Sequence, residues 1–487
     1  MIEYPVIDWW AVAPDIAMGV GAAVTLLIAA FLRGRGRGIG FVVGLATAAV
    51  VAGLAIAQWG DAPVSTIADT MVVDQVTQIS RIAVSACLVL TLIAAFGWSR
   101  LRDSGAEFAA LLLFAAAGMN LVAAASSFMT LFVALELFSI SLYALSGFAR
   151  DRWSLEAGFK YLVLGTIGSV ILVYGAAFLY GATGSFQFSE VAAGLEETGS
   201  GDLLVVAGGV LVLVGLAFKV GAVPFHMWVP DVYEGAPTPV TGFMAAGTKI
   251  VAFIMMARVL YEALPALRDT WEPALVAMAV ATMVLAAIAA LVQSNVKRML
   301  AYALVGSSGY ALIAVIVGGE QGLRALLFYL VAAAPLALGA FAVIALHERD
   351  VDGPATLESL RAWGFDRPLA GLAMTVFLLG FAGFPLTAGF IGKFLVFGSA
   401  VQSDQWTWLA VVGALTSVVS LGYLLRVIAA LYDRSARSDV LLPAAPGFGS
   451  LNLVIVVCLV LVIALGVAPG LGIDWAGEAA RTLAAGR

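Results

Sequence analysis

The sequence predicts an all-α membrane protein that crosses the bilayer about fourteen times. Of its 487 residues, 62% are hydrophobic and only 11% are charged, whereas ordinary soluble domains carry about 25% charged residues. The mean hydropathy is +1.03, and apolar runs of about 20 residues, enough for one bilayer helix, recur along the whole chain. Ordinary globular, disordered, fibrous and disulfide-rich secreted classes are therefore excluded.

Charge and cysteine usage narrow the class further. The net charge is −6 and no basic run is present, which argues against a nucleic-acid partner. The two cysteines, Cys87 and Cys458, stand alone in apolar stretches without metal or redox spacing. The N-terminal MIEYPVIDWW lacks the basic segment of a cleaved signal peptide, so we expect the first helix to insert itself.

Apolar runs bounded by charge, proline or glycine define the predicted spans in chain order. They cover residues 12–32, 39–58, 78–97, 107–125, 127–148, 160–181, 203–223, 238–261, 273–293, 299–318, 323–346, 369–397, 406–430 and 450–469. Because fourteen is even, both termini should lie on one side of the membrane.

The basic residues orient these spans. One set of alternate loops carries fifteen of them: Arg33, Arg35, Arg37, Arg100, Arg102, Arg150, Arg152, Lys160, Lys297, Arg298, Arg349, Arg361, Arg367, Arg434 and Arg437. The opposite loops and tails carry five: Arg81, Arg268, Arg324, Arg481 and Arg487. The positive-inside rule makes the first set cytoplasmic. Both termini are thus expected on the periplasmic side of a bacterial inner membrane.

The remaining basic residues lie inside the spans, and one carboxylate joins them. They are Lys219, Lys249, Arg258, Lys393 and Arg426, with Glu136 in the fifth span. A charge at mid-membrane costs about 2.5–3.5 kcal/mol or more, so it predicts a function by default. Arg258 and Arg426 lie near the ends of their spans and are expected to reach the interface. Glu136, Lys219, Lys249 and Lys393 lie nearer the middle of their spans and cannot easily reach water. Their alternative role is structural ion pairing within the bundle.

Two of the lysines stand beside helix-breaking prolines. Lys219 precedes Pro224, and Lys393 follows Pro385, so the seventh and twelfth spans should be broken. These spans are five apart, which predicts two five-helix repeats, spans 4–8 and 9–13. Because five is odd, the second repeat should be inverted in the membrane relative to the first. The predicted organisation is residues 1–106 with three helices, 107–261 and 262–432 with the repeats, and 433–487 with the last span and tail. Transporters use such breaks at mid-membrane.

The chemistry of these residues suggests proton transfer. Burial disfavours the charged form of a lysine, and a nearby carboxylate favours it again. If Glu136 approaches and leaves Lys219, that lysine could bind and release a proton, and Lys249 could pass it toward Lys393. Moving a proton against 100 mV costs about 2.3 kcal/mol. The sequence has no phosphate-binding loop, dinucleotide-binding glycines or iron–sulfur cysteine cluster, so the energy source should be another subunit or an ion gradient.

Four motifs add a resemblance to a known family. FHMWVPDVYEGAPTP, ELFSISLYALSGF, SNVKRMLAYALVGSSGY and GFPLTAGFIGKF resemble the antiporter-like membrane subunits of respiratory complex I. The first motif is similar to the subunit N branch of the proton-pumping NADH:quinone oxidoreductases, and the resemblance extends over spans 4 to 13. It implies two inverted half-channels joined by a central polar axis and driven by quinone chemistry elsewhere in the complex.

The resemblance also implies roles for individual residues. Glu136 corresponds to the partner of the central lysine, Lys219 to the lysine of the broken seventh helix, Lys249 to the connecting lysine and Lys393 to the exit-side lysine. No cofactor is implied in this chain; FMN, Fe–S clusters, NADH and quinone are expected in other subunits. The implied partners are the M-, L-, K- and J-type membrane-arm subunits and the lipid bilayer.

Seven further polar residues have roles that the motifs do not fix. Many relatives have a histidine in the tenth span where this chain has Ser307, which cannot titrate near neutrality, so a relay there would need water or hydroxyls. Ser307 and Lys297 are candidates for the central axis. His226 and Asp231 could provide proton access or shape the loop between spans seven and eight. His347 is interpreted as a solvated loop residue, and Asp15 and Asp74 as interfacial carboxylates.

Two other functions remain open. The chain could be an Mrp-type or stand-alone secondary cation/proton antiporter without a redox partner. It could also be a structural spacer whose charges only pair within the bundle. The FHMWVPDVYEG motif favours the complex I hypothesis over both.

Overall fold

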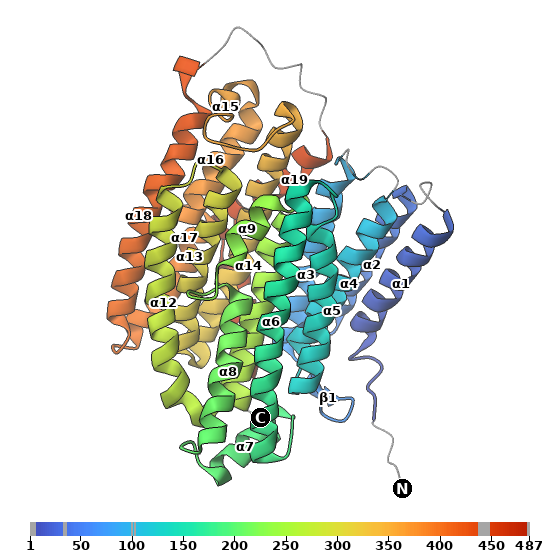
Figure 1. The fold of residues 1–487 in the computed structure, drawn as a ribbon, viewed down its shortest axis with the longest axis vertical. Coiled ribbons are helices and arrows are strands. Elements are labelled where there is room, and N and C mark those ends of the chain that lie inside the picture. Colours follow the sequence, from blue (N-terminus) through green and yellow to red (C-terminus); the bar gives the residue numbers. More distant parts are fainter. Residues whose placement is uncertain (1–5, 33–36, 99–100, 102–103, 437–448, 485–487) are drawn as a thin grey trace.

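A computed structural model describes residues 6–32, 37–98, 101, 104–436 and 449–484. Within these residues, thirteen helices are long and apolar enough to cross a membrane, and they pack side by side as a bundle (Figure 1). The one other predicted span, the twelfth, is a pair of shorter apolar helices, α16 (Pro368–Ala382) and α17 (Ala388–Gln402). The all-α polytopic fold and the broken twelfth span are therefore confirmed.

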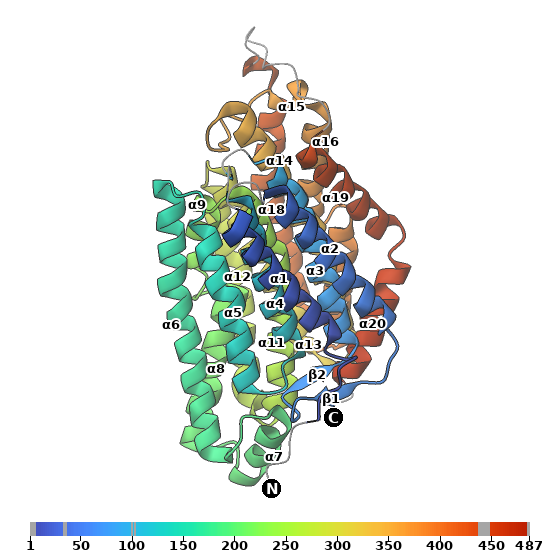
Figure 2. The ribbon, with the colours of Figure 1, turned by 90° about the vertical axis from the view of Figure 1, so that its right-hand side faces the viewer.

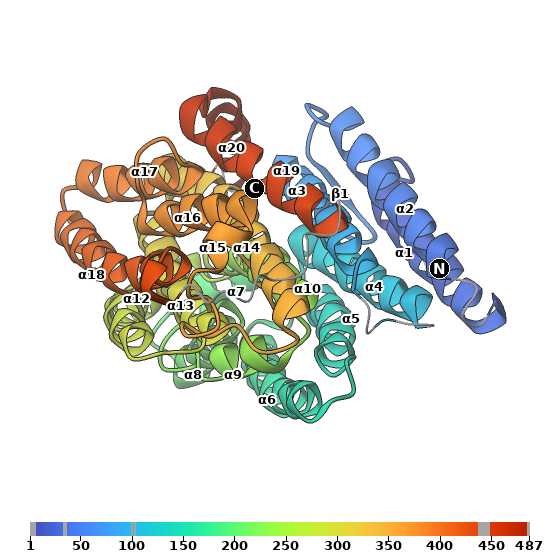
Figure 3. The same ribbon diagram turned by 90° about the horizontal axis from the view of Figure 1, so that it is seen from above.

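The N-terminal segment consists of α1 (Ala13–Leu32), α2 (Arg37–Ala57) and α3 (Gln75–Phe96). A short antiparallel hairpin, β1 (Val64–Thr66) and β2 (Met71–Val73), joins α2 to α3 and pairs Val64 with Val73. Seen from above, α1 and α2 lie at one edge of the bundle, and α12, α17 and α18 lie at the opposite edge (Figure 3). We call the end with β1 and β2 the hairpin end and the opposite one the basic end.

The first repeat begins at the basic end. It comprises α4 (Gly105–Ala124), α5 (Phe128–Ser146), α6 (Arg152–Thr183), α8 (Leu203–Val220) with the short α9 (Trp228–Gly235), and a composite eighth span. That span runs through α10 (Thr238–Phe243), the π-helix η2 (Met244–Thr248), α11 (Lys249–Arg258) and the π-helix η3 (Val259–Ala263). An amphipathic helix, α7 (Phe188–Thr198), lies at the hairpin end and connects α6 to α8.

The second repeat begins at the hairpin end and is thus inverted. After the 3-10 turn η4 (Pro265–Leu267) come α12 (Arg268–Leu291), α13 (Val296–Val317), α14 (Gly319–Val351), α16 with α17, and α18 (Thr407–Leu431). The short elements α15 (Trp363–Asp366) and η5 (Arg434–Ala436) lie at the basic end. The last span is α19 (Ser450–Val467), and α20 (Gly470–Ala484) continues from it toward the hairpin end (Figure 2).

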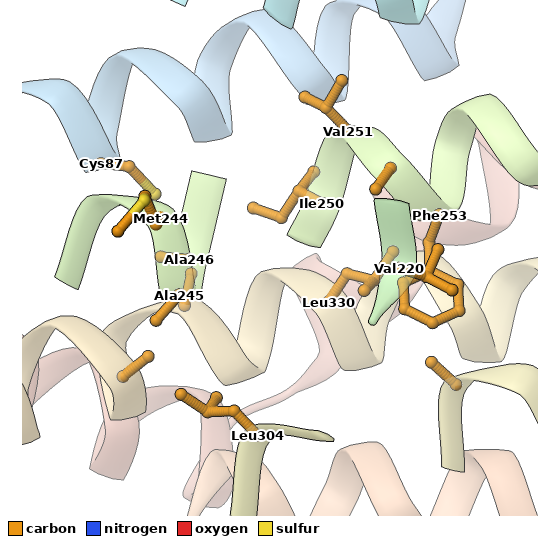
Figure 4. Close-up of a cluster of buried hydrophobic side chains, with 14 of the residues drawn as sticks. Cys87, Val220, Met244, Ala245, Ala246, Ile250, Val251, Phe253, Leu304 and Leu330 are labelled. Atoms are coloured by element: carbon orange, nitrogen blue, oxygen red, sulfur yellow. The ribbon is translucent and has the colours of Figure 1, made fainter. Parts of the chain in front are cut away.

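The bundle is most buried along its centre. The spans Thr238–Ala263, Val296–Val317 and Gly319–Val351 bury about nine-tenths of their apolar windows, whereas the outer helices leave one face for lipid or other subunits. Figure 4 shows Ile250, Val251 and Phe253 of α11 packed among side chains that include Leu304 of α13 and Leu330 of α14. The composite eighth span is therefore held on all sides by protein.

Both described ends of the chain lie at the hairpin end. Ile67, in the hairpin, donates its N–H to the carbonyl of Val6, and Trp475 of α20 contacts Trp59, which follows α2, with ring centroids 5.3 Å apart. This placement agrees with the even number of spans.

Three interpretations from sequence are wrong. His347 lies inside α14 and is fully buried, with Nε2 3.0 Å from the carbonyl of Ser359. Arg258 does not extend to an exposed surface, because its side chain is 1% exposed and paired with Asp74. Asp74, whose side chain is also 1% exposed, is therefore no surface carboxylate.

Candidate functional site: charged groups at mid-membrane

The break in the seventh span follows from glycine and proline chemistry. Helix α8 ends at Val220, Gly221 caps it with φ +70°, and the Val223–Pro224 peptide is cis. Protein groups satisfy the backbone that the break exposes: Trp228 Nε1 donates to the carbonyl of Phe218 at 3.0 Å, and Ser308 Oγ to that of Val220 at 2.7 Å. Irregular backbone at membrane depth is stable under such conditions.

Lys219 lies in the last turn of α8, halfway through the membrane. The neighbouring Phe218 packs against Gly168, which is the midpoint of the 32-residue α6. The Lys219 ammonium is 3.2 Å from Ser139 Oγ and about 6 Å from the ring centres of Phe138 and Phe218. The carbonyl end of a helix and aromatic faces both attract a cation, so an ammonium is accommodated here without a direct ion pair.

Glu136 lies one helical turn before Ser139 on α5. Its Oε1 is buried and has no hydrogen-bond partner, and no ion pair joins it to Lys219 among the described residues. The two groups are nevertheless near enough to interact electrostatically. The predicted pair is thus brought together, but the hydrogen bond of the Lys219 ammonium goes to Ser139.

Lys249 is the first residue after the π-helix η2. Its ammonium donates to the carbonyl of Leu304 and lies 2.7 Å from Ser307 Oγ, both on α13. π-Helical turns occur frequently at functional sites because they change the direction in which side chains project. Ser307 is therefore in direct contact with the connecting lysine.

Lys393 belongs to α17 but reaches back to the break in the twelfth span. Gly383 caps α16 with φ +85°, and the Lys393 ammonium donates to the carbonyl of Ala382 at 3.1 Å and to Ser417 Oγ at 2.8 Å. It also lies 4.6 Å from the centre of the Tyr310 ring. Like Lys219, this lysine occupies the carbonyl end of a half-helix, where the helix dipole favours a cation.

A cavity of about 680 Å³ opens at the basic end, between α6, α9 and α13. Asp231 is 3.0 Å from Lys160 and 2.7 Å from Arg298, and Arg298 also pairs with Glu234 at 2.8 Å. Burial alone would raise the pKa of Asp231, but hydrogen bonds from Lys160 and Arg298 outweigh it and hold that pKa below its usual value. This carboxylate is therefore ionised near neutrality.

Lys297 also lines this cavity. Its ammonium donates to the carbonyl of Ala236 at 2.8 Å and to Thr238 Oγ1 at 3.1 Å, and it is 3.8 Å from Glu348. It is thus placed at the basic end, apart from the contact between Lys249 and Ser307.

His226 lies in the break between α8 and α9, and its ring centre is 6.5 Å from that of Tyr302. Burial lowers its pKa, an effect that a hydrogen bond with the backbone of Pro224 partly offsets. The imidazole is therefore neutral at pH 7. Pro224 and Pro385 are both exposed, each in the irregular segment of its broken span.

Sequence reasoning missed the ion pairs of two buried arginines near the hairpin end. Arg258 Nη2 is 2.6 Å from Asp74 Oδ1, and Arg258 Nη1 is 2.8 Å from Glu262. Arg81, assigned to a loop from sequence, lies in α3 and pairs with Asp15. The signal that could have revealed these pairs is an arginine and a carboxylate at similar predicted depths in two different spans, as for Arg258 with Asp74 and Arg81 with Asp15.

These groups support proton movement by their geometry. Three lysines lie near mid-membrane, and the hydrogen bonds of their ammonium groups go to hydroxyl and carbonyl oxygens. An amine with such partners can lose its proton without leaving a hydrogen-bonded carboxylate buried and without a counter-ion. In the described part of the chain, no three His, Cys, Asp or Glu side chains are grouped so that they could hold a metal ion.

Comparison with known proteins gives a consistent result. The family model for the transmembrane region of the NADH:quinone oxidoreductase/Mrp antiporter proteins matches residues 125–420. Subunit N of the NADH-quinone oxidoreductase of Trichlorobacter lovleyi is 40% identical, with 88% of each chain aligned. That of Mycobacterium tuberculosis strain H37Rv is 44% identical over 77% of this chain and 72% of its own length.

Solved structures agree. A chain of respiratory complex I from Thermus thermophilus is 33% identical, with 95% of this chain and 98% of that chain covered and a TM-score of 0.79. A chain of the Mrp complex of Dietzia has a TM-score of 0.81 at 22% identity, covering 98% of both chains; at that identity the similarity concerns the fold alone.

Proposed function

The chain belongs to the NADH:quinone oxidoreductase/Mrp antiporter membrane-subunit family, among relatives that are complex I subunits N, and on that premise we propose that it moves protons through a relay of Glu136, Lys219, Lys249 and Lys393. Quinone reduction elsewhere in the complex would supply the energy. As a multi-pass protein of the bacterial inner membrane, it would place both termini on the periplasmic side.

One observation carries this proposal: the two broken half-helices each present a lysine at their carbonyl ends, at mid-membrane. Lys219 lies in the last turn of α8, and Lys393 caps α16 through the carbonyl of Ala382. Lys249 lies in the highly buried eighth span. Carbonyl dipoles stabilise the charged form and burial opposes it. The balance can therefore change with a small movement of Glu136.

The basic-end cavity supplies a route toward Lys219 in this proposal. Asp231 and Arg298 hold the short helix α9 against α6 and α13, and His226 lies in the break between α8 and α9. A neutral imidazole can accept and return a proton, so His226 would serve proton access.

The partners follow from the same premise. We propose that the lipid-exposed faces of the bundle meet other membrane-arm subunits of the M, L, K and J types. No redox active site is assigned to this chain. FMN, Fe–S clusters, NADH and quinone would be bound by other subunits of the complex, and the coupling would be conformational or electrostatic.

The test uses inverted membrane vesicles that contain the assembled complex, with NADH-driven quinone reduction and proton pumping measured together. Lys219→Ala should assemble but lose pumping. Lys219→Arg should lose it too, because a guanidinium keeps its charge and cannot release a proton. Arg481→Ala serves as the control, since its side chain is 62% exposed and lies outside the relay. Parent-level pumping in both Lys219 variants would reject the proposal.

A further inference from the structure

Arg426 is an arginine within a span that the proton relay does not use. It lies on α18, five residues before that helix ends at Leu431, and it is exposed. Its Nη1 donates to the carbonyl of Leu291, the last residue of α12. Among the described residues, no carboxylate forms an ion pair with Arg426, whereas Arg258 of the eighth span is paired with Asp74. The charge of Arg426 therefore faces outward from the bundle, and no described carboxylate neutralises it.

The hydrogen bond to Leu291 fixes the depth of the guanidinium. Helix α12 has 24 residues, so it is about 36 Å long, whereas the hydrocarbon core of a bilayer is about 30 Å thick. The end of α12 at Leu291 therefore extends to the level of the lipid headgroups. This is the basic end of the bundle, which the positive-inside rule assigns to the cytoplasmic leaflet.

Exposed apolar residues adjoin Arg426 on both helices. On α18 and on α12 they recur every three or four positions, so each set forms one helix face. The exposed face of α18 includes Val411, Leu415, Val418, Gly422 and Leu425, and that of α12 with its C-cap residue includes Leu285, Ile288 and Val292. From Val411 to Leu425, every exposed residue of α18 is apolar or glycine. Arg426 thus stands at the headgroup end of a surface without polar side chains.

The two faces adjoin each other. Helices α12 and α18 lie side by side at one edge of the bundle (Figures 1 and 3). Gly422 lets them approach closely, because a Cβ atom there would lie 3.3 Å from Leu291 Cδ2. Since Gly422 precedes Arg426 by one helical turn and has no side chain, the guanidinium has direct access to the surface that the two helices share.

An anionic phospholipid has the chemistry that this surface requires. A guanidinium stays charged, and its planar N–H groups match two phosphate oxygens at once. An unpaired charge that faces lipid is costly, and a phosphate at headgroup level neutralises it. Acyl chains need only apolar contacts, which both helix faces supply. Basic residues between membrane helices on the cytoplasmic side bind anionic headgroups in this way.

We propose that Arg426 and the adjoining faces of α12 and α18 bind an anionic phospholipid, whose phosphate contacts the guanidinium and whose acyl chains lie along the two helices. The binding is non-covalent and does not depend on the relay of Glu136 and the lysines, so it is tested separately from the proposed function. A neighbouring subunit at this edge would instead have to bring a carboxylate to Arg426, and the experiment distinguishes the two occupants.

The experiment uses photoactivatable phospholipids in vesicles that contain the assembled complex. Two probes carry the same diazirine-labelled acyl chains, one on phosphatidylglycerol and one on phosphatidylcholine, and each is a minor component of phosphatidylcholine vesicles. After irradiation, labelling of residues 285–292 and 411–425 is quantified by mass spectrometry relative to labelling of the whole complex. The phosphatidylglycerol probe should label these segments about fivefold more, the factor that corresponds to about 1 kcal/mol for one arginine near the membrane surface.

Matched variants assign the preference to Arg426. Arg426→Gln should lower labelling by the phosphatidylglycerol probe about fivefold, to the level of the phosphatidylcholine probe, because it removes the charge. Arg426→Lys keeps the charge without the bidentate geometry and should be labelled more than Arg426→Gln. Arg481→Ala is the control, since it removes an exposed arginine of α20 at the hairpin end; it should be labelled like the parent.

Three results would overturn the inference. They are equal labelling of the parent by both probes, unchanged labelling in Arg426→Gln, and no labelling of either segment, which would show that another subunit covers this edge. Should Arg426→Gln fail to assemble, the parent decides: unlabelled phosphatidylglycerol should abolish the excess labelling, and failure to do so would reject the site. None of these measurements requires proton pumping, so a failure of the proposed function would leave them unchanged.

Discussion

The ion pair between Asp74 and Arg258 predicts a large loss of stability in one variant and its recovery in another. Asp74 Oδ1 accepts from Arg258 Nη2 at 2.6 Å and, as the N-cap of α3, from Thr77 N at 2.9 Å. Asp74→Ala leaves a buried guanidinium with Glu262 as its remaining carboxylate. Breaking a buried pair costs about 3–5 kcal/mol and losing the cap about 1 kcal/mol. Because Glu262 still neutralises part of the Arg258 charge, we expect Asp74→Ala to lower the free energy of unfolding by about 4 kcal/mol.

Three variants make this estimate testable by thermal melting of the detergent-solubilised complex. Asp74→Asn keeps an acceptor at the cap but loses the charge, so it should melt between the parent and Asp74→Ala. The double variant Asp74→Ala/Arg258→Met removes both charges, and such replacements are often nearly neutral. It should melt well above Asp74→Ala alone. A double variant that melts no higher than Asp74→Ala would refute the reasoning, as would Asp74→Ala melting with the parent.

Further predictions concern the second break, the basic-end cavity and the packing of the first repeat. In Gly383→Ala, the methyl group would meet Lys393 Cδ at 2.9 Å in a backbone with φ +85°, so pumping should fall. Gly184→Ala is the control, because Gly184 also has a positive φ, +77°, but open space around it. It should lose only about 1–2 kcal/mol of stability through backbone strain and pump normally. Equal pumping by Gly383→Ala and Gly184→Ala would contradict this prediction. The lowered pKa of Asp231 means that its stabilising contribution is present above the unfolded value of about 3.9 and is lost as pH falls through the folded value. The melting difference between parent and Asp231→Asn should therefore stay constant from pH 8 to 5 and shrink below about pH 4; a change centred near pH 6.5 would contradict this prediction. Gly175→Leu should prevent assembly, because a Cβ there would lie 2.6 Å from a backbone nitrogen of α8; normal assembly would show that the two helices can separate.

The parts of the molecule that sequence could predict share one property: their signal is local. Apolar runs mark the spans, and a proline near a charge in such a run marks a break, as at Pro224 and Pro385. Both breaks lie where predicted, within a few residues. The same local signal identified the lysines that the structure places at mid-membrane.

The parts that sequence could not predict depend on contacts between distant residues. Asp74 and Arg258 are 184 residues apart, and nothing in either span shows that they face each other. His347 looked like a loop residue because charges follow it, yet α14 continues to Val351 and buries it. Ser307 stood out only as a departure from a family pattern, and its contact with Lys249 appears once α11 and α13 are packed together.

The two broken spans reach the same electrostatic arrangement from different sequences. Lys219 precedes its capping glycine, Gly221, by two residues, whereas Lys393 follows Gly383 by ten. Ten residues include the irregular segment and the first turns of α17, so a long side chain pointing back along the helix returns to the carbonyl of Ala382. Because side chains in a helix point toward its N-terminus, a lysine in the second half-helix can serve the first. What the two repeats have in common is therefore a lysine near the carbonyl end of a half-helix, and sequence spacing alone would not have aligned them.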